Sequence, residues 1–177
     1  SMVFQEKMRF IVYAILIIAL SPFLFTAAVF RRSTYKKRYA VPRILVVPVF
    51  SRLGDLVCAT PVFREIKRAY PESFLAVVAA KYTMGIIAEN PRINEVINYN
   101  AVPFKGLRGR GRFFLYIFHS HFDVVISLGN SPSGTLMAIA AAAPVRIKTT
   151  VSHRSFFEVV TDWMTTYRLR YTQGTFL

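Results

Sequence analysis

The sequence predicts an α/β fold in which a parallel sheet is covered by helices and preceded by an N-terminal membrane helix. Three observations support this prediction: an uncharged run of 21 residues near the N-terminus, alternation of short apolar runs with amphipathic stretches after residue 43, and turn-forming segments that follow apolar runs. Strand–helix alternation of this kind is typical of parallel sheets with right-handed crossovers.

The chain of 177 residues suits one domain of ordinary size with a short appendage. We interpret Ser1 as a cloning remnant and leave it out of the argument. The composition then divides the chain into four predicted parts. These are an N-terminal tail (1–9), a membrane anchor (10–30), a basic juxtamembrane linker (31–42) and a single domain (43–177).

The uncharged run from Phe10 to Phe30 is long enough for a membrane helix, since about 20 apolar residues cross a bilayer. A cleavable signal peptide is the first alternative, because Thr26-Ala27-Ala28 is compatible with a cleavage site. The basic stretch after it favours a retained anchor, since such clusters resist translocation. Pro22 must kink or break the helix. The segment is therefore either a kinked spanning helix or a re-entrant helix–break–helix, and in both cases the following domain faces the cytoplasm.

The net charge of +14 predicts a polyanionic partner. Because basic residues directly follow the apolar run, we expect this partner to be anionic membrane lipid and not nucleic acid. The residues expected to contact the membrane surface are Arg31, Arg32, Lys36, Lys37 and Arg38.

From residue 43 onward, strands and helices alternate. Short apolar runs predict strands at 44–49, 74–79, 95–98, 123–128 and 145–147. Apolar residues at helical spacing predict helices around 59–70, 82–89, 113–119 and 135–143, with a further amphipathic helix around 156–164. Pro61 either kinks the first of these helices or opens its main body. The Gly- and Arg-rich segment 103–112 is predicted to be a loop. The alternation predicts a Rossmann-like α/β domain.

Two turn-forming segments follow predicted strands, where open parallel sheets bind their ligands. They are Ser51 to Asp55 (SRLGD) and Gly129 to Gly134 (GNSPSG). In the first, Gly54 permits a tight turn and Asp55 opens a helix. Asp55 has two compatible interpretations: a helix cap that accepts hydrogen bonds from free amides, or a general base. A helix N-terminus favours the negative charge that either role requires.

The sequence contains no recognisable metal motif. None of the nine acidic residues forms an Asp-x-Asp pair, and no pair of carboxylates suggests a glycoside hydrolase. His119, His121 and His153 are interpreted as structural. Cys58 is the only cysteine, which excludes an intrachain disulfide and fits a reducing compartment. We therefore expect neither a metal nor another cofactor.

Several sequence features occur in a defined order. The strand RILVVPVF is followed by Gly54-Asp55, Thr60-Pro61, Tyr70-Pro71 and NPRINEV, and later by FDVVISL and APVRI. This ordered set covers roughly residues 43–148 and resembles glycosyltransferase family 9, the ADP-heptose:lipopolysaccharide heptosyltransferases. The resemblance implies the acceptor-binding N-terminal domain of a two-domain, metal-independent GT-B enzyme. It also implies that Asp55, which matches the aspartate of the family's Gly-Asp motif, removes the proton from the acceptor hydroxyl.

The resemblance implies a heptosyltransferase-like enzyme that transfers a sugar from a nucleotide-sugar, by analogy ADP-heptose, to a lipid-linked acceptor in lipopolysaccharide or envelope glycan synthesis. The expected location is the cytoplasmic side of the bacterial inner membrane. No second, donor-binding domain is recognisable, so we expect either a fragment of a longer enzyme or a half-protein that works with a partner. The chain alone is expected to be inactive. The alternative function is a non-catalytic, membrane-bound scaffolding or acceptor-binding module.

Basic and polar residues of the two segments, of the basic segment 105–112 and at the predicted strand end near Arg146 are candidates for binding an anionic acceptor, because guanidinium forks match phosphate and carboxylate groups. The candidate acceptor-binding residues are Arg52, Gly54, Arg108, Arg110, Arg112, Asn130, Ser131 and Arg146. For the basic segment 105–112 the alternatives are a solvated loop or an additional membrane contact, and nucleic-acid binding is disfavoured by the predicted anchor. Lys148 stands where the resemblance leads us to expect glycine.

Overall fold

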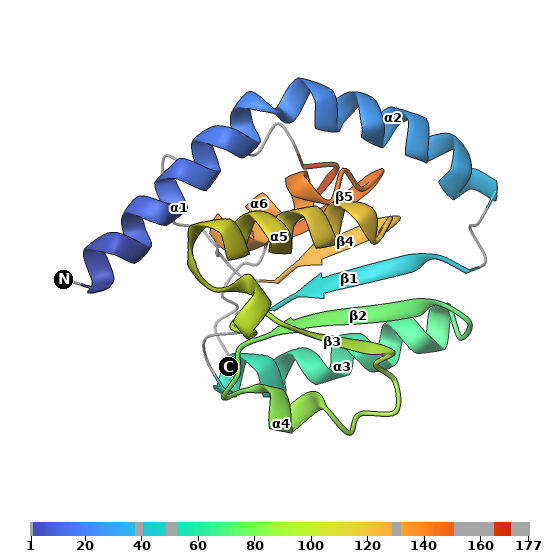
Figure 1. The fold of residues 1–177 in the computed structure, drawn as a ribbon. Helices are drawn as coiled ribbons and strands as arrows, with labels where there is room; N and C mark the ends of the chain where they lie inside the picture. Colours follow the sequence, from blue (N-terminus) through green and yellow to red (C-terminus); the bar gives the residue numbers. More distant parts are fainter. Residues whose placement is uncertain (1, 38–40, 49–52, 129–131, 151–164, 171–177) are drawn as a thin grey trace.

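The computed structural model describes residues 2–37, 41–48, 53–128, 132–150 and 165–170 (Figure 1). Within these ranges, six parallel strands form one sheet in the order β3-β2-β1-β4-β5-β6. The strands are β1 (Arg43–Val47), β2 (Phe74–Ala79), β3 (Glu95–Asn98), β4 (Val124–Ser127), β5 (Val145–Thr150) and β6 (Tyr167–Arg170). The helices are α1 (Met2–Ala19), α2 (Ser21–Lys37), α3 (Leu53–Ala69), α4 (Met84–Ile87), the 3-10 helix η1 (Val102–Phe104), α5 (Gly106–His119) and α6 (Pro132–Ala140).

The predicted Rossmann-like α/β domain is confirmed. β2 and β3 have the predicted bounds, and β1, β4 and β5 lie at the predicted positions. The helix predicted at 82–89 is the shorter α4, and α3 is continuous with Pro61 inside it. Strand β6 was not predicted, and the amphipathic helix expected around 156–164 lies outside the described residues. The sequence pattern therefore predicted the alternation of strands and helices more accurately than the residues at which each element begins and ends.

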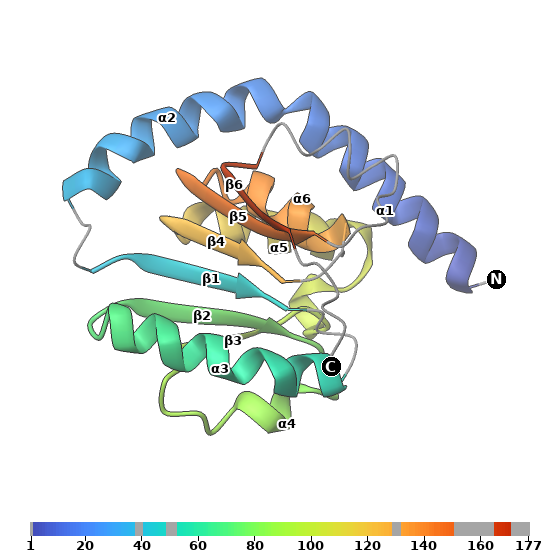
Figure 2. The same cartoon turned by 180° about the vertical axis from the view of Figure 1, so that it is seen from behind.

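The sheet is buried on both faces because helices cover each of them. Figures 1 and 2 show α5 and α6 on one face and α3 and α4 on the other. Successive β1 residues alternate between the two cores: Ile44 and Val46 pack with Phe63 of α3, whereas Leu45 packs with Phe113 of α5. This alternation explains why the parallel strands are continuous apolar runs in the sequence.

The prediction that residues 103–112 form a loop is wrong, because the structure has the 3-10 helix η1 followed by α5 in this region. Gly109 makes this turn of helix possible. A Cβ atom added to Gly109 would lie 2.5 Å from the backbone carbonyl carbon of Phe104. The same helix buries Phe113 and Ile117 against the sheet, and the Phe104 ring meets the Phe113 ring edge to face, with centroids 5.2 Å apart. Tertiary packing therefore overrides the weak helix propensity of the glycines.

The apolar N-terminal segment forms two helices, α1 and α2, which meet at Leu20 beside the Ser21-Pro22 pair. α2 continues to Lys37, so the first part of the predicted linker is helical. Among the described residues, no helix combines the length and the apolar character needed to cross a bilayer. The prediction of a membrane-spanning helix is therefore not supported.

The inner side of α1 and α2 packs on the outer side of α6. Ala14, Ile17, Leu24 and Ala28 are buried there, in one cluster with Leu136, Ile139, Ala140 and Ala142. Small residues on both sides allow the helices to approach closely. The N-terminal helices thus form a further layer outside the α5–α6 layer, as both views show (Figures 1 and 2).

Arg31 fixes the end of this layer. Its guanidinium donates hydrogen bonds to the carbonyl oxygens of Ala141 (2.7 Å) and Phe118 (3.1 Å) and lies 4.4 Å from the Phe118 ring centroid. Both carbonyls lie at helix C-terminal ends, where acceptors lack intrahelical partners. Burial lowers the pKa of Arg31, and the charge of Asp123 opposes this shift. Arg31 was predicted to contact the membrane surface, but its guanidinium is held against α5 and α6; Arg32 is exposed.

We predict that Gly109→Ala destabilises the domain by about 1–3 kcal/mol, because the added methyl group must displace the Phe104 backbone. Gly85→Ala is the matched control, since a Cβ at Gly85 in α4 meets nothing within 4 Å. That change should be neutral or stabilise by up to about 1 kcal/mol. Urea unfolding measures both. Equal stability of the two variants would contradict the close approach of η1 and α5.

Candidate functional site

β1 and β4 lie next to each other at the point where the strand order reverses. From β1 the chain proceeds through β2 to β3 on one side, and β4 begins the other side. Val47 pairs with Ser127 at their carboxyl ends, and the Leu128 N–H donates to the Val47 carbonyl oxygen at 2.9 Å. In open parallel sheets, ligands bind outside the carboxyl ends of strands at such a reversal. The two segments singled out from the sequence therefore follow adjacent strands at this switch point.

Asp55 is the third residue of α3, the helix that follows β1. Its side chain is exposed and makes no hydrogen bond or ion pair with any residue in the described part of the chain. Because α3 begins at Leu53, Asp55 lies inside the first helical turn and is not the residue preceding it, which argues against a simple N-cap. The helix dipole favours a negative charge here. The arrangement offers a solvent-accessible carboxylate beside the switch point, where it can accept a proton.

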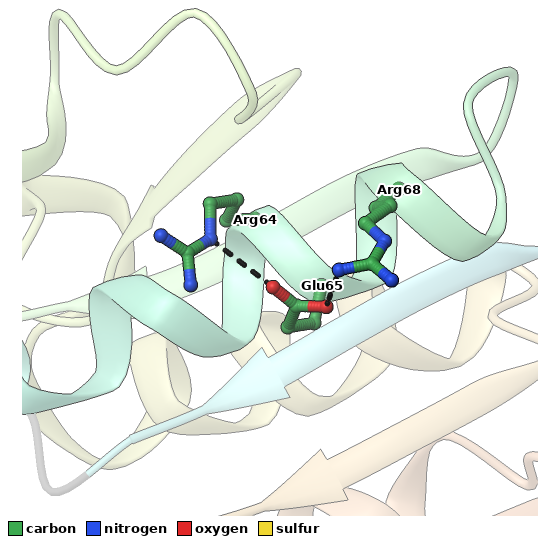
Figure 3. Close-up of polar contacts among 3 residues, drawn as sticks. All are labelled: Arg64, Glu65 and Arg68. Atoms are coloured by element: carbon green, nitrogen blue, oxygen red, sulfur yellow. Dashed lines mark hydrogen bonds and ion pairs between the residues drawn. The ribbon is translucent and has the colours of Figure 1, made fainter.

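Asp55 differs from the other acidic residue of the same helix. Glu65 lies farther along α3 and forms ion pairs with Arg64 (3.1 Å) and Arg68 (3.4 Å), as Figure 3 shows. These side chains are all largely exposed. Such surface pairs contribute at most about 1 kcal/mol each. Glu65 thus has arginine partners on the helix surface, whereas the Asp55 carboxylate has no partner among the described residues.

A buried polar cluster lies between the ends of β4 and β5 and the start of α6, and sequence reasoning missed it. Ser127 at the end of β4 pairs in register with Lys148 of β5, and both are buried, as is Thr135 of α6. The hydroxyl oxygens of Ser127 and Thr135 have no hydrogen-bond partner among the described atoms. The three residues line a cavity of about 10 Å³, which approaches the space that one water molecule occupies. One sequence signal could have revealed this cluster: Ser127 and Lys148 are polar residues that lie at the ends of apolar runs.

Two of the predicted acceptor-binding arginines are exposed near the carboxyl edge. Arg108 and Arg112 lie in the N-terminal half of α5, which follows the carboxyl end of β3. Arg110 has a packing role instead. Its guanidinium lies 3.6 Å from the Tyr99 ring centroid and donates a hydrogen bond to the Tyr99 carbonyl oxygen at 2.5 Å. Arg108 and Arg112 therefore remain candidates for an anionic ligand, whereas Arg110 supports the start of α5.

Arg146, a predicted acceptor-binding residue, lies near the start of a strand and not at its carboxyl end. It is the second residue of β5, which continues to Thr150. Its guanidinium donates a hydrogen bond to the Ala143 carbonyl oxygen and lies 5.2 Å from the Phe25 ring centroid in α2. Burial lowers the pKa of Arg146. The structure thus brings Arg146 to α2, and Arg146 also lines the small cavity with Ser127 and Thr135.

Gly54 is the second residue of α3 and is exposed, and a Cβ atom added at this position would meet nothing within 4 Å. Lys36 and Lys37 lie in the last turn of α2. The remaining predicted site residues fall outside the described residues; they are Arg38, Arg52, Asn130 and Ser131.

A cavity of about 790 Å³ opens at the opposite, amino-terminal edge of the sheet. Its polar lining includes Arg31, Arg43, His119, His121 and Asp123. The Asp123 carboxylate accepts a hydrogen bond from the Arg43 backbone N–H (2.8 Å), and the Arg43 Nε donates to the Ser120 carbonyl oxygen (3.0 Å). In the described part of the chain, no group of three His, Cys, Asp or Glu residues is arranged to hold a metal. Parallel α/β sheets bind their ligands at the carboxyl edge, and this cavity lies at the opposite edge. It is therefore not the candidate site, although it is large.

Comparison with known proteins finds similar sequences over part of this chain. No family model matches the sequence. Two curated proteins do, both named lipopolysaccharide heptosyltransferase 3, one from Escherichia coli strain K12 and one from Escherichia coli; each is 26% identical over 104 residues. The resemblance to glycosyltransferase family 9 is confirmed over part of the chain. The matches cover 57% of this chain but only 30% and 31% of the two heptosyltransferases, so this chain spans less than a third of their length.

Two solved structures share the fold. The glycosyl transferase family 9 protein from Veillonella parvula DSM 2008 matches with a TM-score of 0.62 and 23% identity, over 76% of this chain and 37% of its own. The E. coli ADP-heptose lipopolysaccharide heptosyltransferase II matches with a TM-score of 0.51 and 21% identity, over 60% of this chain and 30% of its own. The sheet described above thus corresponds to about a third of each family 9 structure.

We predict that Gly134→Ala destabilises the domain by about 1–3 kcal/mol, since its Cβ would lie 2.2 Å from the Ser127 hydroxyl oxygen. Ser127→Ala alone should cost little, because that buried hydroxyl has no partner among the described atoms. In the double variant, the nearest remaining atom of residue 127 is its Cβ, at 3.2 Å. The double variant should therefore recover most of the lost stability in thermal or urea unfolding. Additive losses would contradict the contact between α6 and the end of β4.

Proposed function

We propose that this chain is the acceptor-binding half of a GT-B glycosyltransferase, with Asp55 as the general base. One observation carries the proposal: an exposed carboxylate, without a partner among the described residues, lies in the first turn after the central strand at the switch point. The sequence similarity to lipopolysaccharide heptosyltransferase 3 supports glycosyl transfer as the reaction.

In the proposed reaction, the acceptor hydroxyl oxygen attacks the anomeric carbon of a nucleotide-sugar while Asp55 takes its proton. A new glycosidic bond forms, the bond between the anomeric carbon and the diphosphate oxygen breaks, and the nucleoside diphosphate leaves with that electron pair. By analogy with the heptosyltransferase II named above, the donor is ADP-heptose. Neither a metal ion nor another cofactor takes part in this scheme.

The acceptor in this proposal is an anionic, lipid-linked glycan of lipopolysaccharide or envelope synthesis, used on the cytoplasmic side of the bacterial inner membrane. The exposed guanidinium groups of Arg108 and Arg112 favour phosphate or carboxylate groups on it. The donor-binding domain comes from the same polypeptide or from a partner, because this chain spans less than a third of the matched heptosyltransferases.

A second candidate is a non-catalytic module that binds the acceptor or organises glycan synthesis at the membrane. The two functions differ in whether Asp55 is needed for turnover in an assembly that contains a donor-binding domain.

We predict that, in an assembly of this chain with its donor-binding domain, Asp55→Asn lowers kcat by about 10²–10⁴-fold, because the amide cannot accept the acceptor proton. The KM for the acceptor should change little. Glu65→Gln, in the same helix, is the matched control and should leave turnover unchanged, since its ion pairs lie on the exposed surface. Initial-rate measurements of ADP release test both. Undiminished turnover with Asp55→Asn would eliminate the general base and favour the non-catalytic module.

For the 177-residue chain alone, we predict binding of a phosphorylated lipopolysaccharide core oligosaccharide without sugar transfer from ADP-heptose. Replacing Arg108 and Arg112 together by alanine should weaken this binding about tenfold or more, because two charge-assisted contacts are lost. Replacing Arg64 and Arg68 on α3 removes the same charge elsewhere and should have little effect. Titration calorimetry measures affinity. Transfer by the isolated chain would contradict the half-enzyme proposal.

A further inference from the structure

The outward side of α1 and α2 is apolar and exposed. Ile15 is 60% exposed, Leu20 54%, Phe23 65%, Val29 63% and Phe30 75%. These residues recur along both helices, and we call them together the outer stripe. Phe23 also meets the Phe118 ring of α5, with centroids 6.4 Å apart, and Phe30 also lines the cavity at the amino-terminal edge of the sheet. Isolated exposed apolar residues are normal on proteins, but contiguous apolar surface of this kind marks an interaction site.

The inner side of the same helices is already occupied. Ala14, Ile17, Leu24 and Ala28 are buried against α6, and Arg31 ties α2 to the ends of α5 and α6. The two helices are therefore held lengthwise along the domain, where Figures 1 and 2 show them as one arch. In this arrangement they present a long side to any partner, and the N-terminal part of α1 extends beyond the rest of the domain (Figures 1 and 2).

The charges around the outer stripe favour an anionic partner. The chain has no acidic residue between Glu6 and Asp55. Basic residues flank the stripe, with Lys7 and Arg9 before it and the exposed Arg32 after its end, followed by Lys36. Apolar side chains flanked by lysine and arginine suit the boundary between acyl chains and anionic headgroups. A second copy of this chain would instead bring the same basic ends together, which like-charge repulsion opposes.

We propose that the outer stripe docks on an anionic lipid membrane, with α1 and α2 lying in the plane of the surface. The occupant is the bilayer itself, and the apolar side chains enter the headgroup–acyl boundary while the flanking basic residues meet lipid phosphates. Docking of this kind differs from a spanning anchor, because the inner side of both helices stays packed on α6.

The position of α1 connects this surface with the candidate site. In both views, the N-terminal end of α1 lies on the side of the sheet to which the strand arrows point, and α2 ends on the opposite side (Figures 1 and 2). A membrane along the outer stripe therefore passes the carboxyl edge, where a lipid-linked acceptor would meet Asp55. This connection rests on the proposed function, whereas membrane docking does not.

Vesicle co-sedimentation of the 177-residue chain tests the docking. We expect binding to vesicles of phosphatidylcholine with 30% phosphatidylglycerol, and weaker binding to phosphatidylcholine alone. Ile15→Asp combined with Val29→Asp should lower the partition coefficient about tenfold or more, because charged groups must enter the apolar boundary. The matched control is Ile86→Asp with Val102→Asp, the same two changes at exposed positions in α4 and η1, which should bind like the unmodified chain. Circular dichroism verifies that all variants are folded.

A second measurement reports insertion directly and does not depend on the stability of the aspartate variants. In a Cys58→Ser background, a polarity-sensitive fluorophore is attached to Val29→Cys or to Val102→Cys. We expect a blue shift on anionic vesicles only at position 29. Four outcomes would each overturn the proposal. They are no binding to vesicles, an equal loss of binding in the control pair, equal fluorescence shifts at positions 29 and 102, and a dimer of this chain that the Ile15 and Val29 changes dissociate. Because no sugar donor is present, these outcomes are independent of glycosyl transfer.

Discussion

The pairing of β1 with β4 is the constraint on which the candidate site depends. Val47 and Ser127 end side by side, and the hydrogen bond from Leu128 to Val47 holds the two strand ends together. The helices that follow these strands, α3 and α6, are far apart in the sequence, and this pairing brings their starts to the same edge of the sheet. Asp55 is positioned through β1 and α3, and the buried Ser127–Lys148 pair through β4 and β5. Any ligand at this edge therefore meets both halves of the sheet.

Helix α6 connects the sheet with the N-terminal helices. Met137, Ala138 and Ala141 belong to the core between α6 and the sheet, whereas Leu136 and Ile139 face the cluster formed with α1 and α2. A helix that is covered on both sides must be apolar all round, which explains its alanine-rich sequence. The same helix begins at Pro132, within the second segment of the switch point. The packing of the N-terminal layer and the geometry of the candidate site thus share one element.

Positive charge is used in two different ways in this chain. Arg31, Arg110 and Arg146 direct their guanidinium groups to backbone carbonyls and aromatic rings, where they connect layers and helix ends. Arg108, Arg112 and Arg32 are exposed and remain available to anionic partners. Net charge alone does not distinguish these roles, because a guanidinium group serves equally well as a buried donor and as a surface cation. The candidate anion-binding surface is therefore smaller than the count of basic residues indicates.

The sequence by itself determined the order of strands and helices, because strands buried on both faces must be continuous apolar runs such as those of β1 and β2. It also placed Gly54-Asp55 directly after a central strand. Only the tertiary structure decided that residues 106–112 are helical, since this depends on the contact between Gly109 and Phe104. It also decided the arrangement of residues 10–30. Hydropathy measures the preference of a side chain for leaving water, and it does not distinguish lipid from the apolar side of α6 as the partner.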